Sequence, residues 1–153
     1  IKSMKILIFG LPGAGKTWLA ERLQKELNCA WYNADEVRKM ANDWEFSDEA
    51  RIRQARRMRN IADYEKGCGR DVICDFVCPT ELTRHIYEAD ITVWIDTIGE
   101  GRFDDTNKAF ERPNSANVDF HITKHLSEEE GEVKSLAVAI EQRYVLDTEF
   151  IPV

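Results

Sequence analysis

Apolar and polar positions along the chain form short apolar runs separated by longer stretches with helical spacing. The runs at residues 5–10, 71–76 and 91–96 have the length of buried β-strands. Residues 30–33 predict a shorter strand, and the alternation of apolar and polar residues at 118–122 predicts a fifth.

Between these runs, apolar residues recur three or four positions apart, which predicts helices with one buried face. Leu19, Leu23 and Leu27 mark such a face, and Ser47 stands where a long helix needs an N-cap. The predicted helices cover residues 15–28, 35–41 and 47–67, a stretch that has Pro79 in its first turn, and residues 127–146.

The last of these predicted helices has its own start signal. Ser127 and Glu130 have the spacing of a capping box. Its buried stripe is predicted to consist of Val133, Leu136, Ile140 and Tyr144.

Strands that alternate with helices are typical of an α/β fold, in which a parallel sheet is covered on both faces. We therefore predict a three-layer fold with a mostly parallel central sheet of about five strands and helices on both faces. No repeat or linker interrupts the sequence, so residues 1–153 are predicted to form a single domain. Ligands of such sheets bind beyond the carboxyl ends of the strands, which makes polar residues at those positions candidates for a site.

Composition narrows the classes of function. The net charge of −7 argues against a general nucleic-acid binder, and the arginines between residues 51 and 59 are interpreted mainly as a solvated helix face. No apolar run reaches the ~20 residues that a membrane span needs. The cysteines lack metal-ligand spacing, which favours free thiols in a cytoplasmic protein. We expect Met4 to be the natural start, with residues 1–3 as a foreign extension.

Residues 10–17 read GLPGAGKT and fit the phosphate-binding loop pattern G-x-x-x-x-G-K-[ST] at every specified position. The motif lies between a predicted strand and a predicted helix, so backbone N–H groups and the helix start would bind phosphate oxygens. Lys16 would reach the β- and γ-phosphates of ATP, and Thr17 would ligate Mg²⁺. The fold is therefore predicted to be of the P-loop NTPase type. The predicted nucleotide-binding residues of the loop are Gly10, Pro12, Gly13, Ala14, Gly15, Lys16 and Thr17.

Phosphoryl transfer depends mainly on positioning and charge neutralisation, so few further groups are expected. Asp35, which follows the second strand, is the candidate that orients the attacking hydroxyl, and helix capping is the alternative role. Arg38 lies one helical turn later and would hold an anionic group of the acceptor. Asp75 ends an apolar strand, where it would lie near Mg²⁺ or serve as a hydrogen-bonded structural carboxylate.

Residues 97–113 contain few cues for a strand or a helix. Segments of this length are often lids that close over bound phosphates and exclude water, although a passive surface loop is the alternative. The cations available to such a lid are Arg102, Lys108 and Arg112. Arg102 is the predicted lid contact to the nucleotide.

These segments together resemble the adenylylsulfate (APS) kinase family of P-loop kinases. The matching pieces are GLPGAGKT, NADEVR, FSDEARIRQARRM and VICDFVCPTELTR, which occur from Gly10 to Arg84 in the family's order and spacing. The first is common to P-loop proteins, whereas the second and third together are fairly specific. The resemblance implies transfer of the ATP γ-phosphate to the 3′-hydroxyl of adenylylsulfate, with a homodimer as the expected assembly.

Carried over by position, Asp35 matches the acid that orients the hydroxyl. Together with Lys16 of the phosphate loop, it is the predicted catalytic residue. Phe46 would stack on the acceptor's adenine, with Phe103 as a second aromatic on the other side. The acceptor-binding residues that the resemblance implies are Arg38 and Arg51 for the phosphosulfate, the aromatic pair Phe46 and Phe103, and Gln54 in place of an asparagine.

The sequence also departs from the family's motifs. Asn33 and Glu36 replace an Asp and an Asn of the second motif, and Asp75 replaces an Ala. Cys78 replaces a Ser, Thr80 replaces a Tyr, and the lid-like segment is shorter. These departures leave open the identity of the acceptor and the choice between Asp35 and Asp75 as the base.

Two other functions remain open from the sequence. The segment NADEVR, followed by a strand that ends in Asp, is also similar to 5′-polynucleotide kinases, and an unnamed small-molecule acceptor belongs with this reading. A nucleotide switch without catalysis is the third hypothesis. The complete phosphate loop beside Asp35 argues against a switch, and the negative net charge argues against a polynucleotide acceptor.

Overall fold

The computed structural model describes residues 3–149, which form a five-stranded sheet with helices on both faces. The strand order is β2-β3-β1-β4-β5, and every pairing is parallel, so the predicted P-loop NTPase-type α/β fold is confirmed. The strands are β1 (Lys5–Phe9), β2 (Ala30–Asn33), β3 (Val72–Phe76), β4 (Ile91–Ile95) and β5 (Phe120–Ile122).

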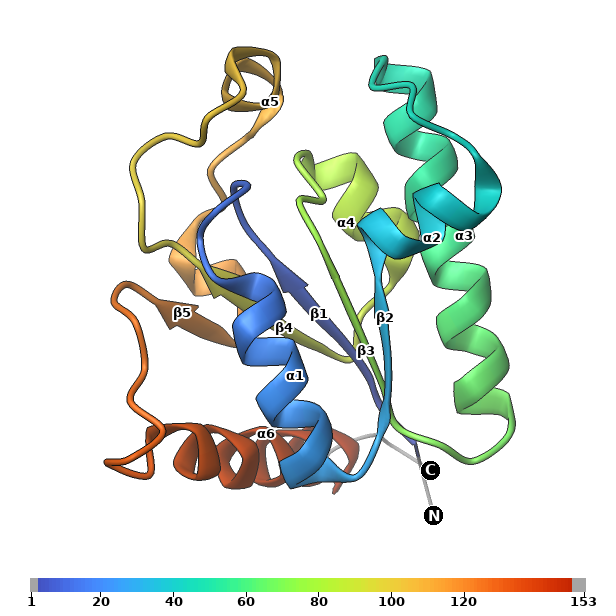
Figure 1. Cartoon of the computed structure of the whole chain (residues 1–153). Helices are drawn as coiled ribbons and strands as arrows, with labels where there is room; N and C mark the ends of the chain where they lie inside the picture. The colour runs from blue at the N-terminus through green and yellow to red at the C-terminus, as the bar shows by residue number, and fades with distance from the viewer. Residues whose placement is uncertain (1–2, 150–153) are drawn as a thin grey trace.

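The helices lie in the connections between these strands and cover both faces of the sheet (Figure 1). Helices α1 and α6 pack together on one face, and α3 and α4 pack together on the other. The α-helices are α1 (Lys16–Leu27), α2 (Ala34–Ala41), α3 (Asp48–Gly67), α4 (Glu81–Tyr87), α5 (Asp104–Ala109) and α6 (Glu132–Glu149), and a 3₁₀ turn covers Ser115–Asn117.

Successive residues of β1 serve opposite cores, because side chains alternate across a strand. Ile6 and Ile8 are fully buried under α1 and α6, where they meet Leu23 and Ile140. The residues between them, Leu7 and Phe9, pack under α3. The central strand therefore reads as a continuous apolar run, as a sheet covered on both faces requires.

Some predicted elements differ from those in the structure. The last helix starts at Glu132 rather than at 127, because Gly131 adopts a φ of +76° that a continuing helix does not allow. The Ser127 hydroxyl still accepts a hydrogen bond from the Glu130 N–H, but it closes a turn before the helix. Helix α5 lies inside the lid-like segment, where no helix was expected.

Some of the helix caps lie where the sequence places them. Ser47 caps α3 by accepting a hydrogen bond from the Ala50 N–H at 3.2 Å, as predicted. Helix α4 spans Glu81–Tyr87 with Thr80 as its N-cap, so the prediction that Pro79 lies in its first turn was wrong: Pro79 precedes the cap. The cysteines are free thiols, of which Cys68 alone is exposed. Across residues 3–149, no helix combines the length and apolar character needed to cross a membrane.

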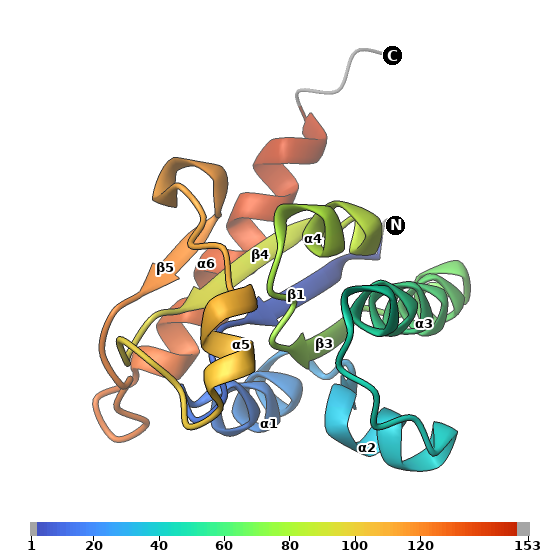
Figure 2. The same ribbon diagram turned by 90° about the horizontal axis from the view of Figure 1, so that it is seen from above.

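The parallel strands direct the functional segments to one edge of the sheet. The phosphate loop follows β1, α2 follows β2, and the lid-like segment follows β4. Seen from above, α5 lies over the end of the sheet where β1 meets α1 (Figure 2). The candidate residues therefore gather at the carboxyl edge, where ligands of such folds bind.

Candidate functional site

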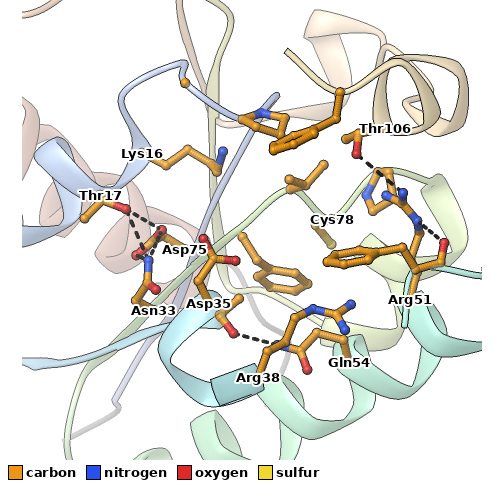
Figure 3. Close-up of a pocket in the computed structure, with 18 of the residues that line it drawn as sticks. Lys16, Thr17, Asn33, Asp35, Arg38, Arg51, Gln54, Asp75, Cys78 and Thr106 are labelled. Atoms are coloured by element: carbon orange, nitrogen blue, oxygen red, sulfur yellow. Dashed lines mark hydrogen bonds between the residues drawn. The ribbon is translucent and has the colours of Figure 1, made fainter. Parts of the chain in front are cut away.

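A cavity of about 780 Å³ opens at the carboxyl edge of the sheet. Its walls come from the phosphate loop, the start of α2, the segment that enters α3, the end of β3 and the lid-like segment. Figure 3 shows Lys16, Thr17 and Asp75 on one side of this cavity and Arg51 on the other. The other predicted site residues that line it are Pro12, Gly13, Gly15, Asp35, Arg38, Phe46, Gln54, Arg102 and Phe103.

The phosphate loop has the geometry that its glycines permit. A Cβ atom on Gly10 would lie 2.4 Å from the carbonyl oxygen of Ile95, so only glycine fits there. Gly15 is the N-cap of α1 with a φ of +104°, which favours glycine as well. Gly10 and Ala14 belong to the loop without lining the cavity, and Ala14 accepts a hydrogen bond from Thr97 through its carbonyl oxygen.

Lys16 is the first residue of α1, and its side chain is 9% exposed. Its Nζ donates to the carbonyl oxygen of Leu11 at 2.9 Å, which holds the ammonium over the loop. Burial lowers the pKa of Lys16 to about 8, and the negative charges of Asp75 and Asp35 oppose that shift. The ammonium thus faces a site where an anionic ligand would stabilise its charged form.

Asp75 forms the centre of a polar cluster beneath the loop. Its side chain accepts hydrogen bonds from the indole N–H of Trp31 at 2.6 Å and from the amide of Asn33 at 3.0 Å. The Thr17 hydroxyl donates to the same carboxylate at 3.3 Å. Burial raises the pKa of Asp75, while the bonds from Trp31 and Asn33 act in the opposite direction.

Asp35 is the second residue of α2, and its exposed carboxylate faces the cavity (Figure 3). It does not cap the helix, because the Asn33 side chain takes that role by accepting from the Glu36 N–H at 3.0 Å. The charge of Asp35 stabilises the cationic forms of both Lys16 and Arg38, so the carboxylate lies within the electric field of both. Its exposed carboxylate is therefore open to a ligand in the cavity.

The opposite wall is built on Phe46. The guanidinium of Arg38 lies 4.5 Å from the centre of its ring and donates to the carbonyl oxygens of Asp43 and Glu45 at 3.0 and 2.9 Å. Arg51 donates to the carbonyl oxygen of Phe46 at 2.9 Å. Burial lowers the pKa of both arginines, although they stay cationic at neutral pH. The wall offers an anion two partly desolvated guanidinium groups beside an aromatic ring.

Gln54 lines the cavity, but its amide is already bound within the protein. The Nε2 group donates to the carbonyl oxygen of Ala34 at 3.0 Å, and Oε1 accepts from Arg57. The side chain is 3% exposed. Gln54 thus ties α3 to the start of α2, the turn that carries Asp35.

The lid-like segment contributes Arg102 and Phe103, with the guanidinium 5.3 Å from the ring centre. The other two predicted lid cations, Lys108 and Arg112, do not line the cavity. Arg112 instead donates to both carboxylate oxygens of Asp96 at 3.1 and 2.9 Å, which anchors the end of the segment.

Several residues of the site were not predicted. Asn33 lies beside Asp75 because the parallel register of β2 and β3 pairs the two residues, and Trp31 reaches the same carboxylate through its indole N–H. The sequence signal for this pairing is that Asn33 and Asp75 each stand at the end of a predicted strand. Trp44 and Thr106 also line the cavity, and no sequence signal marked either of them.

Comparison with known proteins gives these residues a family context. The profile of the adenylylsulphate kinase family matches residues 2–98, a span that ends just inside the lid-like segment. A probable adenylyl-sulfate kinase of Aeropyrum pernix is 33% identical over 94 residues, which are 56% of this chain and 50% of that protein. The adenylyl-sulfate kinase of Pseudomonas entomophila is 35% identical over 83 residues, 50% of this chain and 40% of that protein. The chain thus spans half or less of the length of these curated relatives.

A solved structure extends the likeness to the whole fold. The APS kinase of Mycobacterium tuberculosis, determined in complex with AMPPNP and APS, superposes with a TM-score of 0.73 and 20% identity. The match covers 92% of this chain and 98% of that one. At this identity the superposition concerns the fold, including the segments beyond residue 98 that the family profile does not cover.

Proposed function

The chain belongs to the adenylylsulphate kinase family, and on that premise we propose that it is an ATP-dependent kinase that phosphorylates adenylylsulfate. The γ-phosphate of ATP would pass to the 3′-hydroxyl of adenylylsulfate, giving ADP and 3′-phosphoadenylylsulfate. One observation carries the proposal. A single cavity joins a complete phosphate loop to a wall of arginines and an aromatic ring, with Asp35 facing the space between them.

The phosphate side would neutralise charge. Backbone N–H groups of the loop and the start of α1 would bind phosphate oxygens, and Lys16 would follow the charge that shifts onto the β–γ bridging oxygen. Burial lowers the pKa of Lys16 in the free protein, so an anionic partner would stabilise its ammonium form.

The residues present also fit a magnesium ion. Mg²⁺ prefers oxygen ligands, and the Thr17 hydroxyl and the Asp75 carboxylate lie 3.3 Å apart beneath the phosphate loop. Mg²⁺ held there would supply charge neutralisation on the β- and γ-phosphates. Trp31 and Asn33 would keep the Asp75 carboxylate oriented through the hydrogen bonds that they donate.

Asp35 would act on the acceptor. As the acceptor oxygen forms a bond to the γ-phosphorus and the bond to the β–γ bridging oxygen breaks, the hydroxyl proton would pass to the Asp35 carboxylate. Arg38 and Arg51 would hold the phosphosulfate, and Phe46 with Phe103 would stack on the adenine. Closure of the segment that carries Arg102 would keep water away from the transferring phosphoryl group.

A kinase of this family with a different acceptor is the second candidate, and Gln54 supplies the observation that favours it. The amide that stands at an acceptor-binding position is bound to Ala34 and Arg57, so it has little left to offer a ligand. Asp75 adds a carboxylate where the resembling motif has an alanine. A 5′-hydroxyl polynucleotide or another small molecule would then be the substrate.

The experiment is a coupled ADP-release assay with Mg-ATP and three acceptors tested separately. Adenylylsulfate alone should stimulate ADP release, and adenosine 5′-phosphate and a 5′-hydroxyl oligonucleotide should not. The Lys16→Ala variant should bring the stimulated rate down by orders of magnitude while its circular dichroism stays unchanged. Stimulation by the oligonucleotide instead, or by none of the three while ATP still binds, would overturn the proposed acceptor.

A further inference from the structure

The loop between α2 and α3, residues 42–47, carries both Trp44 and Phe46 on the acceptor side of the cavity. Trp44 and Phe46 are each 52% exposed, so burial in the hydrophobic core does not hold them. An exposed loop of this kind would lose affinity for a ligand if it sampled many conformations, because ordering it would cost entropy on binding. Something else must order it.

Asp43 is the residue that ties this loop to α3. Its carboxylate accepts from Arg53 at 2.8 and 3.0 Å and from Arg57 at 2.9 Å. Arg38 lies at 4.0 Å from the same carboxylate. Three arginines from two helices thus converge on one carboxylate that is 10% exposed. The hydrogen bonds from Arg53 and then Arg57 hold the pKa of Asp43 below its ordinary range, so it stays ionised at neutral pH.

The contacts of these arginines continue into the site. Arg38 also donates to the carbonyl oxygens of Asp43 and Glu45, and its guanidinium lies against the ring of Phe46. Arg57 also donates to Gln54, whose amide holds the carbonyl oxygen of Ala34 at the start of α2. One carboxylate therefore supports both the aromatic wall and the turn that precedes Asp35.

We propose that Asp43 is a positioning residue for the acceptor, which it places by fixing the loop of Trp44 and Phe46 against the arginines of α3. Asp43 is absent from the residues that line the cavity, so it acts through its neighbours. Arg53 and Arg57 therefore hold Asp43 in place, whereas the sequence suggested that the arginines of α3 mainly form a solvated face. The inference rests on the proposed function only for the identity of the acceptor.

The first test uses Asp43→Asn, which keeps the shape of the side chain and removes its charge. Its matched control is Glu45→Gln, because Glu45 is an exposed carboxylate whose side chain, among residues 3–149, has Arg53 as its one partner, at 3.2 Å. We expect the KM for the acceptor to rise on the order of 10- to 100-fold in Asp43→Asn, as a misplaced binding wall would cause. The KM for ATP should change by less than about twofold, since the phosphate loop lies across the cavity. A parallel rise in both KM values, or no rise, would overturn the proposal.

The second test does not depend on the acceptor. Trp44 lies next to Asp43, so acrylamide quenching of its fluorescence reports whether the loop is held. The contribution of Trp44 to the fluorescence is obtained by subtracting the signal of the same protein with the additional substitution Trp44→Phe. Quenching of Trp44 should increase in Asp43→Asn and stay unchanged in Glu45→Gln. If adenylylsulfate proves not to be the acceptor, the proposed function fails, while unchanged quenching alone would still refute the role of Asp43.

A third variant guards against misfolding. Arg53 is 46% exposed at its side chain, so Arg53→Gln removes the bidentate partner with little risk to the core. It should shift the acceptor KM and the quenching in the same direction as Asp43→Asn. The double variant should show less than the sum of the two single effects in free energy, because both changes break one contact. Strict additivity would mean that the pair has no shared role.

Discussion

A Cβ atom on Gly101 would lie 3.2 Å from both the Cδ atom and the carbonyl oxygen of Pro12. The lid-like segment therefore touches the phosphate loop at a point where a Cβ atom would fit only if a neighbouring atom moved by a few tenths of an ångström. The Asn107 side chain holds this close approach by accepting from the Gly101 N–H at 2.7 Å and donating to its carbonyl oxygen at 2.9 Å. Arg102 and Phe103 follow directly, so their position depends on this contact.

We predict that Gly101→Ala will move the segment away from the loop by a few tenths of an ångström and lower kcat/KM for ATP about 3- to 30-fold. Gly99→Ala is the matched control, because a Cβ atom at Gly99 would meet nothing within 4 Å. Steady-state kinetics with Mg-ATP and the acceptor would measure both variants, with thermal unfolding to compare their stability. Equal kinetics for the two variants would mean that the contact with Pro12 has no influence on the site.

The layers of the fold could be predicted from the sequence because local and global signals agree. The run from Ile6 to Phe9 is apolar on both faces, as in a parallel strand that helices cover on both sides. The leucines of α1 are spaced for one buried face, and Leu19 and Leu23 are buried as that spacing predicts. The predicted start of α6 was wrong because Gly131, and not the signal at Ser127, decides where the helix begins.

The candidate site was predictable only in part, because sequence patterns identify ligating groups better than the groups that hold them. The phosphate loop and Asp35 follow a motif and a strand end, and both face the cavity. The partners of Asp43 lie 10 and 14 positions away, and nothing in the sequence pairs a carboxylate with an arginine at such a distance. The ion pair of Arg112 with Asp96 was missed for the same reason.

Asp35 and Asp75 should respond differently to loss of charge. Asp35→Asn should keep ATP binding and lower transfer about 10²- to 10⁴-fold, the usual contribution of a positioned base. Asp75→Asn should raise the Mg²⁺ concentration needed for half-maximal rate, and saturating Mg²⁺ should restore much of the transfer. Rates measured across a Mg²⁺ titration would separate the two effects. Full activity of Asp35→Asn would transfer the role of base to Asp75.

Arg112 and Lys108 are two cations of the lid-like segment, and their contacts differ. Arg112 binds Asp96 through both of its terminal nitrogens, whereas Lys108 is exposed and away from the cavity. Arg112→Gln should loosen the end of the segment and admit water to the site. The ratio of acceptor-independent ATP hydrolysis to phosphoryl transfer should therefore rise ~3- to 10-fold. Lys108→Gln should leave this ratio unchanged. A similar rise in both variants would point to a general effect of positive charge instead.

Asp96 gives the protein a pH-dependent part of its stability. Burial alone would raise its pKa, but the hydrogen bonds from Arg112 and His121 outweigh burial and hold the pKa of Asp96 below its ordinary value. The unfolded chain therefore takes up a proton first as the pH falls, starting near the ordinary value of ~3.9. The stabilisation is present above that pH and is lost as the pH falls through the lowered folded value.

We accordingly predict that Asp96→Asn will be less stable than the parent protein at pH 7 and that the difference will shrink below about pH 4. Urea unfolding at a series of pH values from 7 to about 3 would measure this convergence. The same comparison made in the Arg112→Gln background should show a smaller pH-dependent part, because one of the two donors that lower the pKa of Asp96 is then missing. A difference between parent and variant that stays constant across the series would mean that the Asp96 carboxylate contributes through packing and not through its charge.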